Sequence, residues 1–184
     1  MKNIILLLFF LGFVSNVFAD DVATNVLKLK SLNACNGCDL NSAVLMNTKL
    51  ENAKLYEVNL TNANLAGINL TKAVLGSANL TNANLTDANL TKAYLGFAIL
   101  TDVNLLDANL TSANLTKAVL SSANLTNTNL NNANFLNADL TNANLTNADL
   151  TNANLTNADL TNIILQNTIL CNTNTPWGIE NSGC

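Results

Sequence analysis

The chain has 184 residues, a length that suits one domain. Its hydrophobic content is 49%, yet aromatic residues make up only 5% and charged residues 11%, with a formal net charge of −4. This mild charge excludes both the basic surface that binds nucleic acid and the dense acidity of a DNA mimic. The apolar residues are nearly all Leu and Ala, and most of the rest are Asn and Thr, which indicates a repeat.

Residues 1–19 have the pattern of a signal peptide. Met1-Lys2-Asn3 is short and positive, Ile4 to Val14 is apolar, and Val17-Phe18-Ala19 predicts cleavage after Ala19. Without Lys2 the net charge becomes −5. An uncleaved anchor is the alternative, but the apolar run is shorter than the roughly 20 residues of a spanning helix. We therefore expect a periplasmic or extracellular protein, lumenal if the host has thylakoids, with no stable membrane insertion after cleavage.

Residues 20–34 precede the repeat and are predicted to form an N-terminal cap. Val22, Val26, Leu29 and Leu32 have the spacing of a short amphipathic helix over Asp21 to Leu32. A cap is needed because the end of a repeat stack exposes unpaired strand edges, through which chains would polymerise.

Residues 35–170 repeat with a period of five. From Leu40 to Leu170 every residue number divisible by five is Leu, except Phe135. Two residues before each Leu stands mostly Ala, and otherwise another small or β-branched residue. Asn or Asp mostly separates the two, and Thr mostly follows the Leu, so that Ala143 to Asn147 is a complete unit.

A period of five fits neither a helix nor a flat strand. On a helix every fifth residue advances by about 500°, so the leucines would not share a face. In an extended chain Ala and Leu, two residues apart, point the same way. The three polar residues that follow must turn the chain, and Asn, Asp and Gly suit such corners. The result is a coil with Leu and Ala inside.

This pattern resembles the pentapeptide-repeat family, whose unit is a small residue, Asn or Asp, Leu or Phe, Ser or Thr, and a variable residue. The opening Cys35-Asn-Gly-Cys38-Asp-Leu40 and the ending Asn181-Ser-Gly-Cys184 resemble its exported and thylakoid-lumen members. The resemblance implies an all-β fold, a right-handed quadrilateral β-helix with four pentads per coil and about seven coils. At about 4.8 Å between strands the rod would be roughly 30 Å long.

With four pentads per coil, residues twenty apart stack and threonines form rows along the rod. The two rows are Thr61, Thr81, Thr101, Ser121, Thr141 and Thr161, and Thr71, Thr91, Thr111, Asn131 and Thr151. Such rows suit polar corners with side-chain hydrogen bonds from coil to coil. Regularly spaced hydroxyls would also suit an ice- or surface-binding face, which stays an alternative.

Residues 171–184 contain the only Pro and the only Trp, and are predicted to cap the last coil. Cysteines at opposite ends of such a rod are too far apart to pair, since a disulfide spans only about 4.4–6.8 Å between Cα atoms. We therefore predict a Cys35–Cys38 bridge and a disulfide-closed cap with Cys171–Cys184, as an exported chain allows. Buried free thiols, and redox or zinc chemistry at Cys35 and Cys38, are the alternatives.

The chain lacks the residues of common catalytic sites. It has no histidine, which excludes Ser–His and Cys–His nucleophiles and histidine-based metal sites. Asp139 and Asp159 are one coil apart, but on a convex exterior rather than in a cleft. No phosphate-binding glycine motif is present. We predict no enzyme activity, no catalytic or metal residues, no cofactor and no small-molecule substrate.

Outward positions become apolar at one place in the repeat. The candidate interaction patch comprises Tyr94, Phe97, Ile99, Leu106 and Val119, with Val119 one coil above Ile99. Exposed apolar patches mark contact sites, although scattered surface residues are the alternative.

These observations favour a non-catalytic exported protein that acts as a rigid interaction or scaffold module. Its partner is expected to be another protein or the envelope surface, with no nucleic acid, and the chain a monomer or weak dimer. The resemblance also raises a gyrase-protecting DNA mimic, which the signal peptide and the mild charge disfavour.

Overall fold

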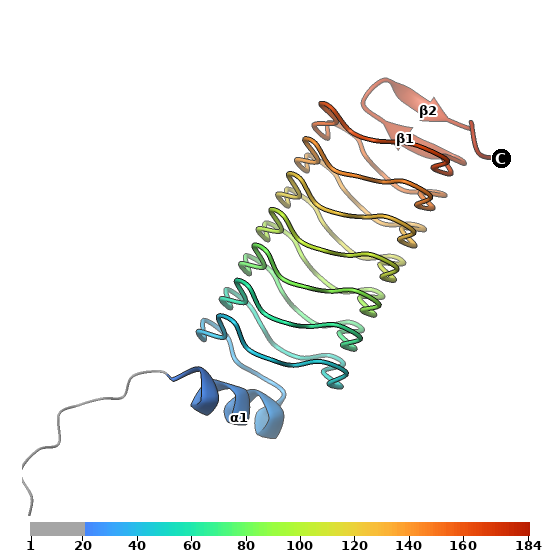
Figure 1. The fold of residues 1–184 in the computed structure, drawn as a ribbon. Coiled ribbons are helices and arrows are strands. Elements are labelled where there is room, and N and C mark those ends of the chain that lie inside the picture. Colours follow the sequence, from blue (N-terminus) through green and yellow to red (C-terminus); the bar gives the residue numbers. More distant parts are fainter. Residues whose placement is uncertain (1–20) are drawn as a thin grey trace, which may run out of the picture.

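A computed structural model describes residues 21–184, so the predicted signal peptide lies outside the described residues. Figure 1 shows helix α1 (Val22–Leu32) at one end of a straight stack of coils, and a hairpin at the other. The hairpin consists of strands β1 (Thr173–Thr175) and β2 (Gly178–Glu180), paired antiparallel. Within residues 21–184, no helix has the length and apolar character that crossing a membrane requires.

The coils are held together by parallel bridges between residues twenty positions apart. The first pairs Ala34 with Lys54, and the last pairs Asn154 with Asn174. Each coil therefore consists of four pentads, as the sequence resemblance implies. The leucine N–H donates to the next coil, as from Leu80 to the carbonyl of Ile99 at 2.7 Å, so the backbone itself carries the ladder.

The interior is filled by the two apolar positions of each pentad. Leu100 and Phe135 have no exposed surface, and Ala98 has none either. Where Thr replaces the alanine, its hydroxyl finds a backbone partner: Thr128 is buried and donates to the carbonyl of Leu105 at 3.1 Å. The leucine register predicted from the sequence is therefore the core of the rod.

Each corner contains one residue in the left-handed backbone region. In the coils this residue has a number ending in 2 or 7 and a φ of 51–65°, as at Asn142 with 60°. Most side chains clash with the backbone here, and Asn and Gly are the residues that tolerate it best. The abundance of Asn in the sequence is thus a requirement of the corners.

Helix α1 lies against the first coil (Figure 1). Asp21 caps its N-terminus by accepting a hydrogen bond from the N–H of Ala23 at 3.2 Å. Leu29 and Asn25 are fully buried, and Asn25 donates from Nδ2 to the carbonyl of Asp39 at 2.9 Å. Leu32, which the spacing predicts to face the coil, is instead 67% exposed. The helix ends there, and Asn33 turns the chain in a left-handed conformation.

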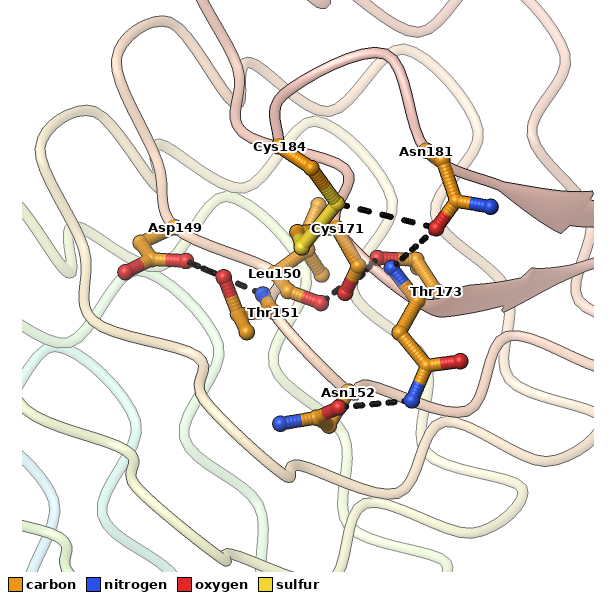
Figure 2. Close-up of a disulfide and its surroundings, with 9 residues drawn as sticks. Asp149, Leu150, Thr151, Asn152, Cys171, Thr173, Asn181 and Cys184 are labelled. Atoms are coloured by element: carbon orange, nitrogen blue, oxygen red, sulfur yellow. Dashed lines mark hydrogen bonds between the residues drawn. A yellow bond between two sulfur atoms is a disulfide. The ribbon is translucent and has the colours of Figure 1, made fainter.

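The parallel ladder continues four residues past Leu170, where the leucine register predicts its end. Thr173 and Thr175 take the inward positions and are buried, so β1 is the last segment of the coil path. Figure 2 shows Cys171 joined to Cys184, with Asn181 beside them. The second disulfide joins Cys35 and Cys38, both buried in the first coil. Both pairs are those predicted from the sequence.

Candidate functional site

Most threonines of the rod are bonded within their own coil. In a typical pentad the Oδ1 atom of Asn accepts two hydrogen bonds from the Thr two residues later, one from its N–H and one from its hydroxyl. For Asn109 and Thr111 these measure 3.0 and 2.7 Å. Because these hydroxyl protons are committed to the adjacent asparagine, the threonine rows stabilise corners. This arrangement supports the structural interpretation of the rows over a surface-binding one.

Side-chain hydrogen bonds from coil to coil are made mostly by asparagine, and six of these donors occupy the left-handed corner position. Asn147 donates from Nδ2 to Asn127 at 3.0 Å, and Asn167 donates in turn to Asn147 at 3.2 Å. The sequence predicts such exchange for both Asn and Thr rows. It occurs mainly in the Asn rows because the amide has both a donor and an acceptor, pointing to opposite neighbours.

Three aspartates replace the usual Asn in the C-terminal half. Burial is the largest influence on the pKa of Asp139 and raises it, but hydrogen bonds from Thr141 and Ser121 outweigh this and lower the pKa. Burial likewise opposes a lowered pKa at Asp149, where Thr151 and Asn131 donate. At Asp159 the hydrogen bonds from Thr161 are the largest influence and lower the pKa. These carboxylates are therefore corner acceptors.

These lowered pKa values predict a loss of stability in acid. A carboxylate with a lowered folded pKa stabilises the fold fully above its unfolded value of about 3.9, and less as the pH falls through the folded value. We expect the denaturant midpoint to fall between about pH 5 and pH 2. In the variant Asp139→Asn/Asp149→Asn/Asp159→Asn the fall should be smaller, since Asn keeps the Oδ1 acceptor. Denaturant unfolding followed by circular dichroism at several pH values measures this.

A matched control removes the same number of negative charges from aspartates at the left-handed corner position. It is the variant Asp87→Asn/Asp102→Asn/Asp107→Asn, whose residues have φ values of 55–58°. Equal acid dependence in the two triple variants would contradict the role assigned to the three carboxylates.

Two tyrosine rings lie on a strip of glycine backbone in the N-terminal half of one face of the rod. Tyr56, Gly76 and Gly96 are spaced by twenty residues and so occupy one row. A Cβ atom built on Gly76 would lie 2.7 Å from Cε1 of Tyr94 and 3.0 Å from Cδ2 of Tyr56, and one on Gly96 would lie 2.6 Å from the Tyr94 hydroxyl. The rings thus occupy space that only glycine leaves free, and they remain 43% and 39% exposed.

Phe97 stands at the adjacent corner in a backbone conformation that disfavours it. Its φ is 61°, where other coils have Ser77 or Asn137, and its ring is 53% exposed. The Nζ atom of Lys117, one coil later, lies 5.2 Å from the ring centroid, a cation–π contact. A bulky residue at positive φ costs about 1–2 kcal/mol. Such strain together with exposure points to a role outside folding.

We call the surface formed by Tyr56, Val74, Tyr94 and Phe97 the aromatic face. Ile99 and Val119 lie around the corner from Phe97 on the adjoining face, where they pair in a parallel bridge, and Val119 is half-buried.

Leu106 is separated from the other residues of the predicted patch. It follows Gly96 by two pentads, half a coil, and therefore lies at the opposite corner of the rod. Leu106 and Tyr94 are near each other along the chain, which is why the sequence pattern places them in one patch. In a coil of four pentads, however, residues ten apart point in opposite directions. The remaining patch residues lie on two adjoining faces.

Sequence reasoning missed Tyr56, Val74, Gly76 and Gly96. The signal that could have found them is the twenty-residue spacing, which stacks Val74 beneath Tyr94 and puts two glycines above Tyr56. Neither glycine has the positive φ that would explain it as a corner residue. Glycine at a position usually filled by Thr therefore indicates space reserved for a neighbour.

Charge is distributed unevenly around the rod. The aromatic face and its edges bear four exposed lysines, Lys54, Lys72, Lys92 and Lys117, against two carboxylates, Glu51 and Glu57. Lys49 is the other lysine of the coils and lies on a neighbouring face. The opposite face is flanked by aspartates, namely Asp87, Asp102 and Asp107. A chain of net negative charge thus has one positively charged side.

A second apolar surface lies at the C-terminal end of the rod. Leu160, Ile163 and Leu165 of the last coil are only partly buried, and with Trp177 they line an apolar pocket beside the hairpin. Trp177 donates from Nε1 to Glu180 at 2.7 Å, which holds its ring in place. The tail therefore covers part of the core end.

Within residues 21–184, no cluster of three His, Cys, Asp or Glu side chains is placed to hold a metal ion. The four cysteines are all in disulfides. The arrangement brings exposed aromatic rings and lysines together on one side of the rod.

Comparison with known proteins agrees with this architecture. The family described as Pentapeptide repeats matches in eight copies, over residues 34–62, 59–95, 88–127, 118–157 and 153–174. No curated protein matches the chain.

Among solved structures, a pentapeptide repeat protein from Nostoc PCC 7120 is 39% identical over 41% of this chain and 62% of its own, with a TM-score of 0.40. The chain thus spans less than two thirds of that protein. HetL, involved in heterocyst differentiation regulation in Nostoc sp. strain PCC 7120, is 25% identical over 83% and 96%, with a TM-score of 0.28.

A pentapeptide repeat protein of the Arabidopsis thaliana thylakoid lumen is 26% identical over 67% of this chain and 71% of its own, with a TM-score of 0.37. Since these TM-scores are low, the assignment rests on the repeat, which matches well over half of the chain. The chain belongs to the pentapeptide-repeat family, and the parallel bridges between its coils make it a β-helix solenoid.

Proposed function

We propose that the protein is a non-catalytic, exported interaction module, a rigid rod that presents its aromatic face to a partner. The observation that carries this proposal is the aromatic face itself. Elsewhere the sides of the rod are mostly Asn, Thr and Asp that bond to one another, whereas here exposed rings stand on glycine and at a strained corner. Exposed aromatic side chains are enriched at interaction sites.

The rod suits this role because it is rigid along its length. Backbone bonds of 2.6–2.8 Å join the leucine position of most pentads to the next coil, so the face has a fixed geometry and loses little entropy on binding. Helix α1 and the disulfide-closed hairpin cover strand edges at the two ends, which would hold the rod as a monomer or weak dimer. Two disulfides fit an oxidising compartment, in line with the signal peptide predicted from the sequence.

The test is whether the purified protein co-sediments with the isolated envelope fraction of its source organism, and whether Phe97 is required. Phe97→Asn places the preferred residue at a left-handed corner. We expect the free energy of unfolding to rise by about 0.5–1 kcal/mol. The relief of backbone strain stabilises the variant by more than the lost exposed cation–π contact destabilises it. Retention by the envelope should nevertheless fall at least about fivefold, on the order of 1 kcal/mol of lost contact.

The control removes an outward apolar residue from the opposite corner. Leu106→Thr introduces the residue that Thr86 and Thr126 provide in the same row, and retention should stay at the wild-type level. Equal losses in the two variants, or no loss in either, would contradict the assignment of the aromatic face.

A further inference from the structure

We propose that the aromatic face binds an anionic polysaccharide, a chain of sugar rings that carry carboxylate groups. This inference rests on the proposed function and specifies the partner of the same face. Three features carry it: aromatic rings that lie against glycine backbone, lysines beside them, and a Tyr94 backbone whose hydrogen-bonding groups are used between coils.

The tyrosines form a platform for stacking. The Tyr94 ring has its Cε1 edge against Gly76 and its Cε2 edge against Gly96, so this ring lies along the backbone of two coils, whereas Tyr56 meets Gly76 with its Cδ2–Cε2 edge. A ring that lies flat exposes its negative π-face to solvent. The C–H groups on the face of a pyranose ring bear partial positive charge and are apolar enough to pack there. A flat ring supported from below therefore fits a sugar ring.

The lysines supply the charge complement. Lys72 and Lys92 stand in one row, one coil apart, at corners two residues before Val74 and Tyr94. Lys54 precedes Val74 in the row of Tyr94, and Lys117 lies over Phe97. Adjacent coils are separated by about 4.8 Å, so the charges recur along the rod, as carboxylates recur along a uronic acid polymer. The aspartates flanking the opposite face would repel the same polymer.

A peptide fits this face less well. Extended peptides commonly bind by adding a strand to an open sheet edge. Here the backbone groups of Tyr94 are used between coils: its N–H donates to the carbonyl of Ala73 at 2.9 Å, and its carbonyl accepts from the N–H of Leu75 at 2.7 Å. A polysaccharide needs no such edge. Four lysines on a chain of net negative charge are also too few for the phosphates of a nucleic acid.

The experiment measures retardation of the purified protein in native gels that contain sodium polygalacturonate, with dextran as the uncharged sugar polymer and polyaspartate as the anion without sugar. We expect retardation by polygalacturonate that weakens as salt rises, because part of the affinity is electrostatic. Tyr94→Ala should weaken the affinity about fivefold to tenfold, as loss of one aromatic contact.

Two pairs of variants separate stacking from charge. Gly76→Ala/Gly96→Ala keeps both tyrosines but lifts their rings, and should weaken binding severalfold while the protein stays folded by circular dichroism. Lys72→Gln/Lys92→Gln should weaken binding and flatten its salt dependence. Lys49→Gln, which removes a lysine away from the aromatic face, should bind like the wild type.

Two results would overturn the proposal. One is the absence of retardation by polygalacturonate. The other is equal retardation by polyaspartate with no effect of Tyr94→Ala, which would show a simple attraction between charges. Neither affects the envelope-retention assay with Phe97→Asn, so the interaction-module function can stand when the polysaccharide assignment fails.

Discussion

Replacing Leu100 with alanine is expected to lower the free energy of unfolding by about 2–5 kcal/mol, the range for large-to-small changes in a core. Leu100 has no exposed surface and lies midway along the rod, with Leu80 and Leu120 in the coils on either side. Because the site recurs in every coil, the result applies to the whole leucine register.

The upper half of this range is expected because the cavity cannot collapse. The coils on either side are fixed by backbone bonds at the same place: the N–H of Leu80 reaches the carbonyl of Ile99 at 2.7 Å, and that of Leu100 reaches Val119 at 2.6 Å. Closing the cavity would require these bonds to lengthen. The lost contacts are therefore not regained by relaxation.

The matched control is Thr101→Ser at the next residue. Thr101 is partly exposed, and its replacement should change the free energy of unfolding by less than about 0.5 kcal/mol. Guanidinium unfolding of the two variants and the wild type, compared by midpoint at equal slope, measures both effects. Equal midpoint shifts for Leu100→Ala and Thr101→Ser would contradict the inward assignment of the leucines.

The sequence predicts the core because burial requires an apolar residue at every fifth position of the coil. A residue such as Leu100 must be apolar wherever the coil brings it inside, so the five-residue register can be read directly. The disulfide pairs are predictable for a related reason, since a rod keeps Cys35 far from Cys184. Asn at a left-handed corner, as at Asn142, follows from local backbone energetics. These features depend on short-range rules that each pentad repeats.

The aromatic face depends on contacts between coils, which a five-residue pattern does not show. Tyr94 and Leu106 look alike as outward exceptions, yet they lie on opposite sides because the coil closes after four pentads. Nothing within its own pentad requires glycine at position 76. The requirement comes from tyrosine rings elsewhere in the rod, which occupy the space where a Cβ atom would lie. Leu32 likewise fits the helical spacing, but the position where the chain leaves the helix decides its exposure.

Removal of the Cys171–Cys184 disulfide is expected to open the C-terminal end of the rod. The bridge joins cysteines thirteen positions apart, and a loop of this size contributes about 3 kcal/mol in the chain-entropy description. The variant Cys171→Ser/Cys184→Ser should therefore lose about 2–3 kcal/mol. It keeps the bridge at the other end, where Cys35 and Cys38 are buried.

The loss should be local because few other contacts hold the tail. Asn172 donates two hydrogen bonds: its N–H donates to Oδ1 of Asn181 at 2.8 Å, and its Nδ2 donates to Oδ1 of Asn152 at 2.8 Å. Without the bridge the Asn181 contact has only the hairpin to position it. The partly buried Leu165 and its neighbours would then be more exposed to water.

Hydrogen exchange measured by mass spectrometry tests this directly. Peptides from residues 155–184 should exchange faster in the variant, and peptides from residues 60–120 should keep wild-type protection, since stacked repeats contact only their neighbours. Adding a reductant to the variant acts on the Cys35–Cys38 bridge alone and so measures its separate contribution. Unchanged exchange in residues 155–184 would show that the hairpin holds the last coil without the disulfide, and the bridge would then have no structural role at this end.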